Sequence, residues 1–222
     1  MVVLQQIFAV FLKDLKSELR TRYALTAVFL FVLTTISIVL FATRDEQLTQ
    51  GMAAGILWII MFFSAMTGLS KSFVSEEERG TSFLLQLTTT STAVYFGKLL
   101  FNCILNVLLN TVAILLFFFF IDVRVNSPLL FSLAILLGSL GIACSVTVIS
   151  AIIAKANTKG ALLPVLSFPL LLPLLISGIE TTFLSLSGAK FSDVRGDFQM
   201  MGSYCVVVTT ASYLLFDFIW QE

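Results

Sequence analysis

Hydrophobic residues gather in six long stretches along the chain, and the polar segments between them are short. A helix rises about 1.5 Å per residue, so crossing a hydrocarbon layer roughly 30 Å thick takes about 20 apolar residues. Six stretches meet this requirement: 23–42, 51–70, 99–121, 129–154, 161–179 and 199–219. Among them, only the last contains a charged residue, Asp217, close to its end. The pattern predicts an all-α polytopic membrane protein with six transmembrane helices.

The composition agrees with this pattern. Hydrophobic residues make up 58% of the 222 residues and charged residues only 12%, and the mean hydropathy is +1.02. Charged residues are about 25% of an ordinary soluble domain. No segment between the stretches is long enough for a soluble domain, so residues 1–222 are expected to form a single transmembrane domain.

The segment before the first stretch has a different pattern. Its apolar residues recur at helical spacing between Leu4 and Leu19, with charged residues between them. This predicts an amphipathic helix within residues 1–22 that lies in the membrane interface. A cleaved signal peptide is the alternative, but Asp14, Glu18 and the lack of an uninterrupted apolar core argue against it. We therefore expect the helix to stay attached.

Lys and Arg residues are unevenly divided between the two sides of the predicted bundle. One side carries Lys13, Lys16, Arg20, Arg22, Lys71, Arg79, Lys98, Lys155 and Lys159. The other side carries Arg44, Arg124, Lys190 and Arg195. Cytoplasmic flanks of membrane helices carry the excess of Lys and Arg. Both termini are therefore expected in the cytoplasm.

Residues 71–98 form the longest predicted cytoplasmic segment. Ser75 and Glu78 have the spacing of a capping box, Gly80 offers a turn, and residues 82–87 suit a second short helix with an apolar face. Residues 88–92 are expected to be a polar connection. One interpretation is a solvated loop that only enforces topology; the other is a docking element for another protein. The candidate docking residues are Glu76, Glu77, Glu78, Arg79, Gly80, Phe83, Leu84 and Leu87.

Asn102, Asn106 and Asn110 recur every four residues in the third stretch, which places three amides on one helix face. Amides facing lipid would lack hydrogen-bond partners, so this stripe should face another helix or a wet cavity. The first would make it interhelical glue, and the second would make it a substrate contact. In the fourth stretch, Gly138 and Gly141 each have a small residue four positions away, which favours close packing.

Pro164, Pro169 and Pro173 lie in the fifth stretch. Each removes a backbone donor and tends to bend a helix, either as a moving part or to match a neighbour's shape. The following residues 180–198 mix leucines with serines, glycines and charges. They are expected to be an external loop or to dip partly into the outer leaflet.

Several sequence signals for chemistry are missing. The chain has no histidine, the usual axial ligand of haem iron, and its three cysteines lie in apolar stretches without a CxxC pair. No phosphate-binding G-x-x-x-x-G-K-[ST] motif occurs, and no nucleophile, base and orienting group converge. We therefore expect no catalytic residue, bound cofactor or metal in this chain, and an energy source in a separate subunit.

Several short motifs, taken in order, are similar to one known family. They are Phe11-x-x-Asp14-Leu15-x-x-Glu18-x-Arg20, Gly55-Ile56-Leu57-Trp58, Lys71-x-Phe73 followed by acidic residues and Gly80, Gly97-Lys98, Leu162-Leu163-Pro164, Phe168-Pro169-Leu170 and Pro173-Leu174-Leu175. With these motifs the chain resembles the CcmB family, the haem exporter protein B permeases of cytochrome c maturation, over almost its full length. Ser70 departs from the family, whose members often have an acidic residue there.

The resemblance implies an ABC-2 type permease in a bacterial-type inner membrane, with two copies in the complex. It implies a CcmA-like ATPase that binds the ATP, and CcmC-, CcmD- and CcmE-like components. The expected role is to couple ATP hydrolysis to haem export or to the release of a haem-loaded chaperone, with haem as a candidate cargo and no nucleic acid involved.

Two other functions fit the residues. An ABC-2 permease that exports a lipid, a polysaccharide or a drug would share the architecture but carry different cargo. A non-transporting scaffold would hold other membrane subunits without any ATPase. Only the transporter interpretations predict an associated P-loop protein whose hydrolysis changes when the permease is present.

Overall fold

The structure is a computed structural model that describes residues 2–43, 48–154 and 162–221. Within these ranges the chain forms nine α-helices and no strands. They are α1 (Val2–Thr21), α2 (Tyr23–Thr43), α3 (Gln50–Leu69), α4 (Lys71–Glu78), α5 (Ser82–Thr88), α6 (Ser91–Phe120), α7 (Pro128–Ala154), α8 (Leu162–Ser187) and α9 (Phe191–Gln221). Arg44, Lys155, Lys159 and the predicted start of the fifth span at Ala161 lie outside the described residues.

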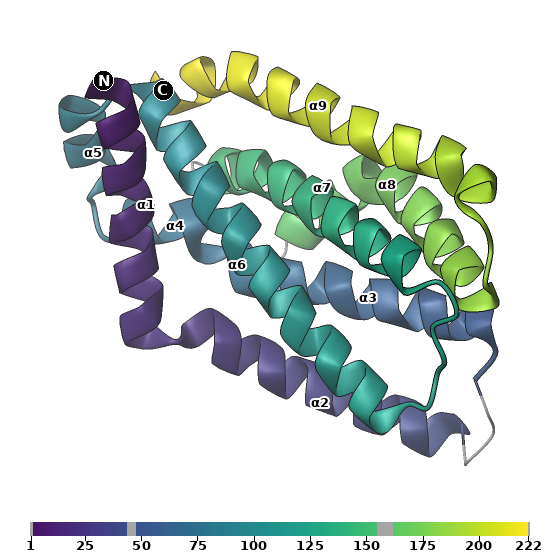
Figure 1. Ribbon diagram of the computed structural model, residues 1–222. Coiled ribbons are helices and arrows are strands. Elements are labelled where there is room, and N and C mark those ends of the chain that lie inside the picture. The colour runs from purple at the N-terminus through teal and green to yellow at the C-terminus, as the bar shows by residue number, and fades with distance from the viewer. Residues whose placement is uncertain (1, 44–47, 155–161, 222) are drawn as a thin grey trace.

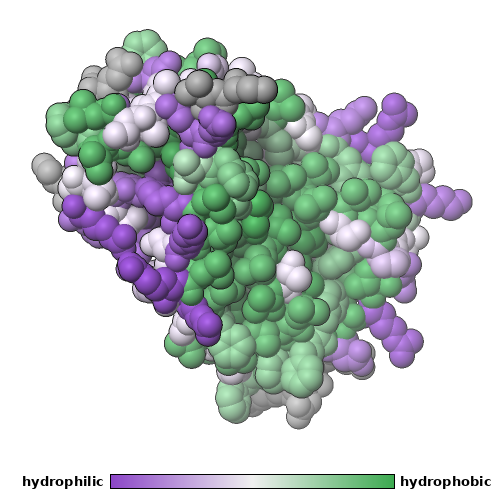
Figure 2. Space-filling model, turned by 60° about the vertical axis from the view of Figure 1, so that its left-hand side comes forward, coloured by the Kyte–Doolittle hydropathy of each residue, from purple (hydrophilic) through white to green (hydrophobic). Residues whose placement is uncertain are grey.

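The prediction of six transmembrane helices is confirmed. Helices α2, α3, α6, α7, α8 and α9 are each long and apolar enough to cross a bilayer. Figure 2 shows a broad hydrophobic band bounded on two sides by hydrophilic residues. Such a band is the surface expected where a bundle meets lipid tails between two layers of water and headgroups.

Two predicted loops are largely helical. α6 begins at Ser91, inside the predicted polar connection, because the Thr90 hydroxyl accepts a hydrogen bond from the Ala93 N–H and caps the helix. α8 continues past residue 180 to Ser187, and α9 starts at Phe191, so residues 180–198 do not form a long loop. The hydroxyls of Thr181 and Ser185 bond backbone carbonyls one turn back, which lets polar residues remain in the helix.

The six long helices run side by side, and α1 crosses one end of them (Figure 1). α4, α5 and both ends of the described chain lie at this same end, which we call the α1 end. Arg22 separates α1 from α2 with a positive φ of 52°. The Glu18 carboxylate accepts a hydrogen bond from the Ala24 N–H at 2.8 Å and thereby stabilises the start of α2 after this sharp change of direction.

At the centre of the bundle, three helices pack around the side chain of Trp58. The Trp58 ring from α3 lies against Gly138 of α7 and Gly178 of α8, and a Cβ at either glycine would come within 2.2 Å of the ring. The Trp58 Nε1–H donates to the Thr182 hydroxyl at 2.8 Å. The two glycines therefore provide space for a large side chain that joins three helices.

Candidate functional site: the α1 end

α4 and α5 form a compact helical hairpin at the α1 end. Gly80, with φ of +64°, makes the turn between them, as predicted for a residue without a side chain. The predicted capping box differs from the structure, because α4 already begins at Lys71 and Ser75 is therefore inside the helix. The sharp turn and the two short helices leave one face of α5 away from the bundle.

That face of α5 is apolar and exposed. Phe83, Leu84 and Leu87 have exposed fractions of 67%, 62% and 69%, and we call them the α5 patch. Glu78, Arg79 and Gly80 are also exposed and Glu77 is half-buried. Exposed large apolar side chains beside charges at the end of a bundle are typical of a surface that contacts another protein.

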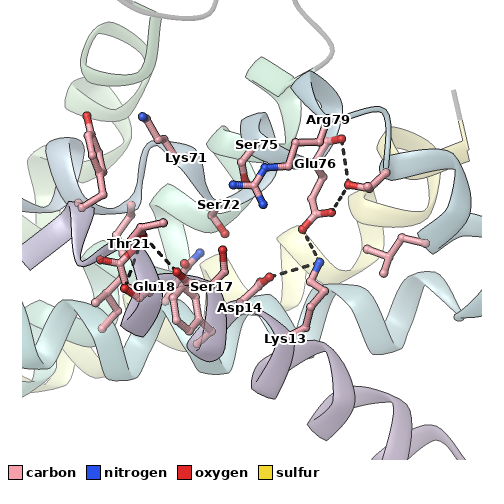
Figure 3. Close-up of a pocket in the computed structure, with 18 of the residues that line it drawn as sticks. Lys13, Asp14, Ser17, Glu18, Thr21, Lys71, Ser72, Ser75, Glu76 and Arg79 are labelled. Atoms are coloured by element: carbon pink, nitrogen blue, oxygen red, sulfur yellow. Dashed lines mark hydrogen bonds and ion pairs between the residues drawn. The ribbon is translucent and has the colours of Figure 1, made fainter.

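Glu76 was predicted to be part of the docking surface, but its side chain points into the protein. It is only 9% exposed, and its carboxylate forms ion pairs with Lys13 and Lys98 and accepts a hydrogen bond from the Thr81 hydroxyl at 2.6 Å. The buried carboxylate stays paired with Lys98, which is buried as well, because leaving that cation unpaired would be costly. Glu76 therefore belongs to an internal cluster (Figure 3).

Lys98, one of the cations counted for the orientation of the bundle, is at the centre of this cluster. Its side chain is 1% exposed, and its Nζ lies 3.0 Å from Asp14 Oδ2 and 3.4 Å from Glu76 Oε1 and donates to the Ser72 carbonyl at 2.6 Å. Lys13 also pairs with Asp14, at 3.3 Å. We call Lys13, Asp14, Glu76 and Lys98 the ion cluster. It joins α1, α4 and α6.

The residue before Lys98 explains how α1 comes close enough for these contacts. A Cβ at Gly97 would lie 2.8 Å from Val10 Cβ and 2.9 Å from the Ile7 carbonyl oxygen. Both distances are shorter than real Cβ contacts, so only glycine lets α1 sit directly on α6 here. The Gly97-Lys98 pair thus combines a close helix approach with a charge that faces Asp14.

The charges of the cluster change the acidity of Glu76, which lies beyond the apolar run of α3. Burial alone would raise its pKa, but Lys98 and Lys13, together with hydrogen bonds from Lys13 and Thr81, outweigh burial and lower the pKa to about 2. Glu76 is therefore ionised throughout the physiological pH range, and the cluster is a lasting structural contact.

Aromatic side chains attach the other side of the hairpin to α9. The Phe73 ring centroid from α4 lies 5.7 Å from that of Phe216, which stacks on Trp220 at 5.6 Å. Lys98 Nζ lies 4.9 Å from the Phe73 ring centroid, so Phe73 touches both groups of residues. The Gln86 side chain also donates to the Trp220 carbonyl. The hairpin is thus held between α1, α6 and the C-terminal part of α9.

The three asparagines of α6 face α7 and are fully buried. The Asn102 side-chain N–H donates to the Thr147 hydroxyl at 2.9 Å, Asn106 donates to the Ser139 carbonyl at 2.8 Å, and Asn110 donates to the Ser139 hydroxyl at 2.9 Å. These three bonds join α6 to α7. Asn102 additionally lines a cavity at the α1 end.

The three prolines occupy different positions in α8. Pro164 lies in the first turn, where backbone N–H groups have no partner within the helix. A proline there removes no helical hydrogen bond and does not bend the helix. Pro169 and Pro173 lie inside the helix and each removes one backbone hydrogen bond. The Leu170 carbonyl accepts a hydrogen bond from the Tyr204 hydroxyl of α9 at 3.0 Å.

No group of three or more His, Cys, Asp or Glu side chains suited to a metal ion occurs in the part of the chain that the structure describes. The cysteines in that part are free. The site at the α1 end is therefore built from ion pairs, packed aromatic rings and an exposed apolar patch. These features lie together at one end of a multi-pass helical membrane protein.

Comparison with known proteins agrees with the sequence motifs. The family model described as CcmB protein matches residues 5–217, so the chain belongs to the CcmB family. The comparison with curated proteins gave no match. The family is one of transporter permeases and not of enzymes, and it provides a membrane component of haem-exporting ABC transporters. Membership therefore implies an assembly with an ATPase partner.

Proposed function

We propose that this chain is the permease subunit that couples a separate CcmA-like ATPase to haem export or to the release of a haem-loaded chaperone during cytochrome c maturation. CcmC-, CcmD- and CcmE-like components are the expected further partners, and haem is the expected cargo. The lack of histidine in the chain favours a subunit that transmits force without ligating haem iron.

The observation that carries this proposal is the exposed α5 patch on a hairpin that is fixed to the bundle from two sides. Phe83, Leu84 and Leu87 are mostly exposed, whereas the ion cluster and the rings around Phe73 attach the same hairpin to α1, α6 and α9. A movement of the ATPase against the patch would therefore be transmitted through the hairpin to α1, α6 and α9. We assign Glu77, Glu78, Gly80 and the α5 patch to ATPase docking, and Glu76 to transmission. Arg79 was also a predicted docking residue, but its side chain points into a cavity behind the hairpin, so we leave it out of the docking surface.

The excess of Lys and Arg supports an orientation with the α1 end in the cytoplasm. This orientation would put both termini and the hairpin on the side where an ATPase finds ATP. We further propose a bacterial-type inner membrane as the location and a pair of permeases facing a pair of ATPases, because ABC ATPases act as dimers.

Co-purification with the ATPase tests the docking assignment. Phe83→Asp and Glu78→Lys place a charge on the patch and reverse one beside it, so both should lose most of the ATPase while the permease stays in the membrane. Phe191→Asp and Glu180→Lys are matched controls, because both residues are exposed but lie toward the opposite end of the bundle. Unchanged ATPase retention by Phe83→Asp and Glu78→Lys would refute the assignment.

A further inference from the structure

A cavity of about 510 Å³ opens at the α1 end between α1, the α4–α5 hairpin and α6 (Figure 3). Its size is within the range of small-molecule sites, roughly 300–1,000 Å³. One part of the wall is polar, with Ser17, Ser72 and Arg79 pointing toward the same space. Another part is apolar and includes Leu69, Leu85, Phe101 and Leu105. An occupant should therefore have a polar head and an apolar body.

The charges around the cavity favour an anion. The two cations and two carboxylates of the ion cluster balance one another. Of the remaining charged residues in the wall, Lys71 and Arg79 have no ion pair among the described residues, whereas Glu18 carries one negative charge. Lys71 lies over the Tyr23 ring, with Nζ 3.7 Å from the centroid. One positive charge is thus left over, which matches a singly charged anion such as a phosphodiester.

Two buried oxygen atoms at the cavity have no partner. Asn102 is fully buried in its wall, and its Oδ1 accepts no hydrogen bond from any described residue. The Ser72 hydroxyl is likewise buried without a partner in the described residues. Buried polar groups are seldom left unpaired in native proteins. Both atoms have almost no surface open to the cavity, so an occupant with hydroxyl groups would bond them after a small shift of the Asn102 and Ser72 side chains.

We propose that this cavity binds an anionic phospholipid with a hydroxylated headgroup, of which phosphatidylglycerol is the simplest example. Arg79, Lys71 and the serine hydroxyls would bind the phosphodiester, and the leucine and phenylalanine wall would receive the start of an acyl chain. The α1 end is where lipid headgroups meet the bundle, and basic pockets between helices on the cytoplasmic side favour anionic lipids. The bound lipid would fill the space between α1 and the hairpin.

Native mass spectrometry of the purified full-length chain, titrated with single phospholipids, tests this proposal without the ATPase. Phosphatidylglycerol should bind more tightly than phosphatidylcholine. Lys71→Gln and Arg79→Gln should each weaken phosphatidylglycerol binding roughly fivefold. Lys71→Arg should restore it, and Lys16→Gln should leave it unchanged, because Lys16 is exposed on α1 and does not line the cavity.

Three results would overturn the proposal. Equal binding of the two lipids would remove the preference for an anion. Equal weakening by Lys16→Gln and Lys71→Gln would point to general surface charge. Displacement of the lipid by inorganic phosphate at the same concentration as the lipid would make free phosphate, and not a membrane lipid, the ligand.

Discussion

One face of α6 carries Lys98 and then the three asparagines, at successive intervals of four residues. The charged part and the amide part of this face make different contacts. At the α1 end Lys98 pairs with carboxylates from α1 and α4. Within the apolar span, Asn102 and the next two amides donate hydrogen bonds to α7. Neutral amides avoid the cost of a charge in hydrocarbon. The charged part of α6 therefore connects three helices at the hairpin, whereas the amide part joins one pair of helices.

Removing the central charge should have the largest effect. Lys98→Met leaves Asp14 and Glu76 with only Lys13 to balance them, and breaking a buried pair costs about 3–5 kcal/mol. Thermal unfolding in detergent should show a large loss of stability. Lys16→Met, on an exposed position of α1, should show almost none. A Lys98→Met protein as stable as the wild type would mean that the ion cluster is not a structural contact.

A steric change in the spans should have a smaller effect. Gly138→Ala puts a methyl group against the Trp58 ring and should cost about 1–3 kcal/mol, because a close-packed core resists added volume. Gly55→Ala in α3 is the control, since a Cβ there meets nothing within 4 Å. The same unfolding assay compares them, and equal stabilities would show that the tryptophan does not fill the space as described.

Removing one amide should cost less again. Asn106→Leu deletes one interhelical hydrogen bond, a loss of about 0.6–2 kcal/mol. We expect a modest loss of thermal stability with normal ATPase retention. Thr111→Val, on the exposed side of α6, serves as the control. If Asn106→Leu abolished ATPase binding while unfolding normally, the division between the two parts of α6 would be wrong.

Acid should produce the smallest effect. Because the pKa of Glu76 is lowered to about 2 from an ordinary value of 4.5, its ionic contribution is complete above pH 4.5 and is lost as the pH falls toward 2. Between pH 7 and pH 4 the stability should fall by less than about 1 kcal/mol from this group. Glu76→Gln should lack this part of the pH dependence in unfolding measurements. A wild type and Glu76→Gln with parallel profiles would place the carboxylate outside the cluster.

The periodicity and length of the apolar runs were enough to predict the main elements of the fold. The six spans, the separate N-terminal helix and the turn at Gly80 are properties of local apolar runs and a single glycine, and these agree with the structure. The long helical stretch in residues 180–198 was missed because serines and threonines look like loop formers until their hydroxyls bond the preceding turn.

The ion cluster could not be predicted in the same way. Its residues come from three segments, and Glu76 looks like its exposed neighbour Glu78 when it is read along the chain. One signal was present, because Lys98 continues the face of the asparagine stripe and follows Gly97. That signal indicates an inward-facing charge, but its partners depend on how α1 crosses the bundle, which no local pattern contains.

The most direct test of the account is photo-cross-linking in intact membranes. A photoreactive amino acid replaces Phe83 in the α5 patch or, as the control, Phe191 at the opposite end, and mass spectrometry identifies the captured protein. If the α5 patch docks the ATPase, position 83 should capture a P-loop ATPase and position 191 should capture none. Capture of the ATPase from position 191, or its absence at position 83 in membranes that contain it, would contradict the account.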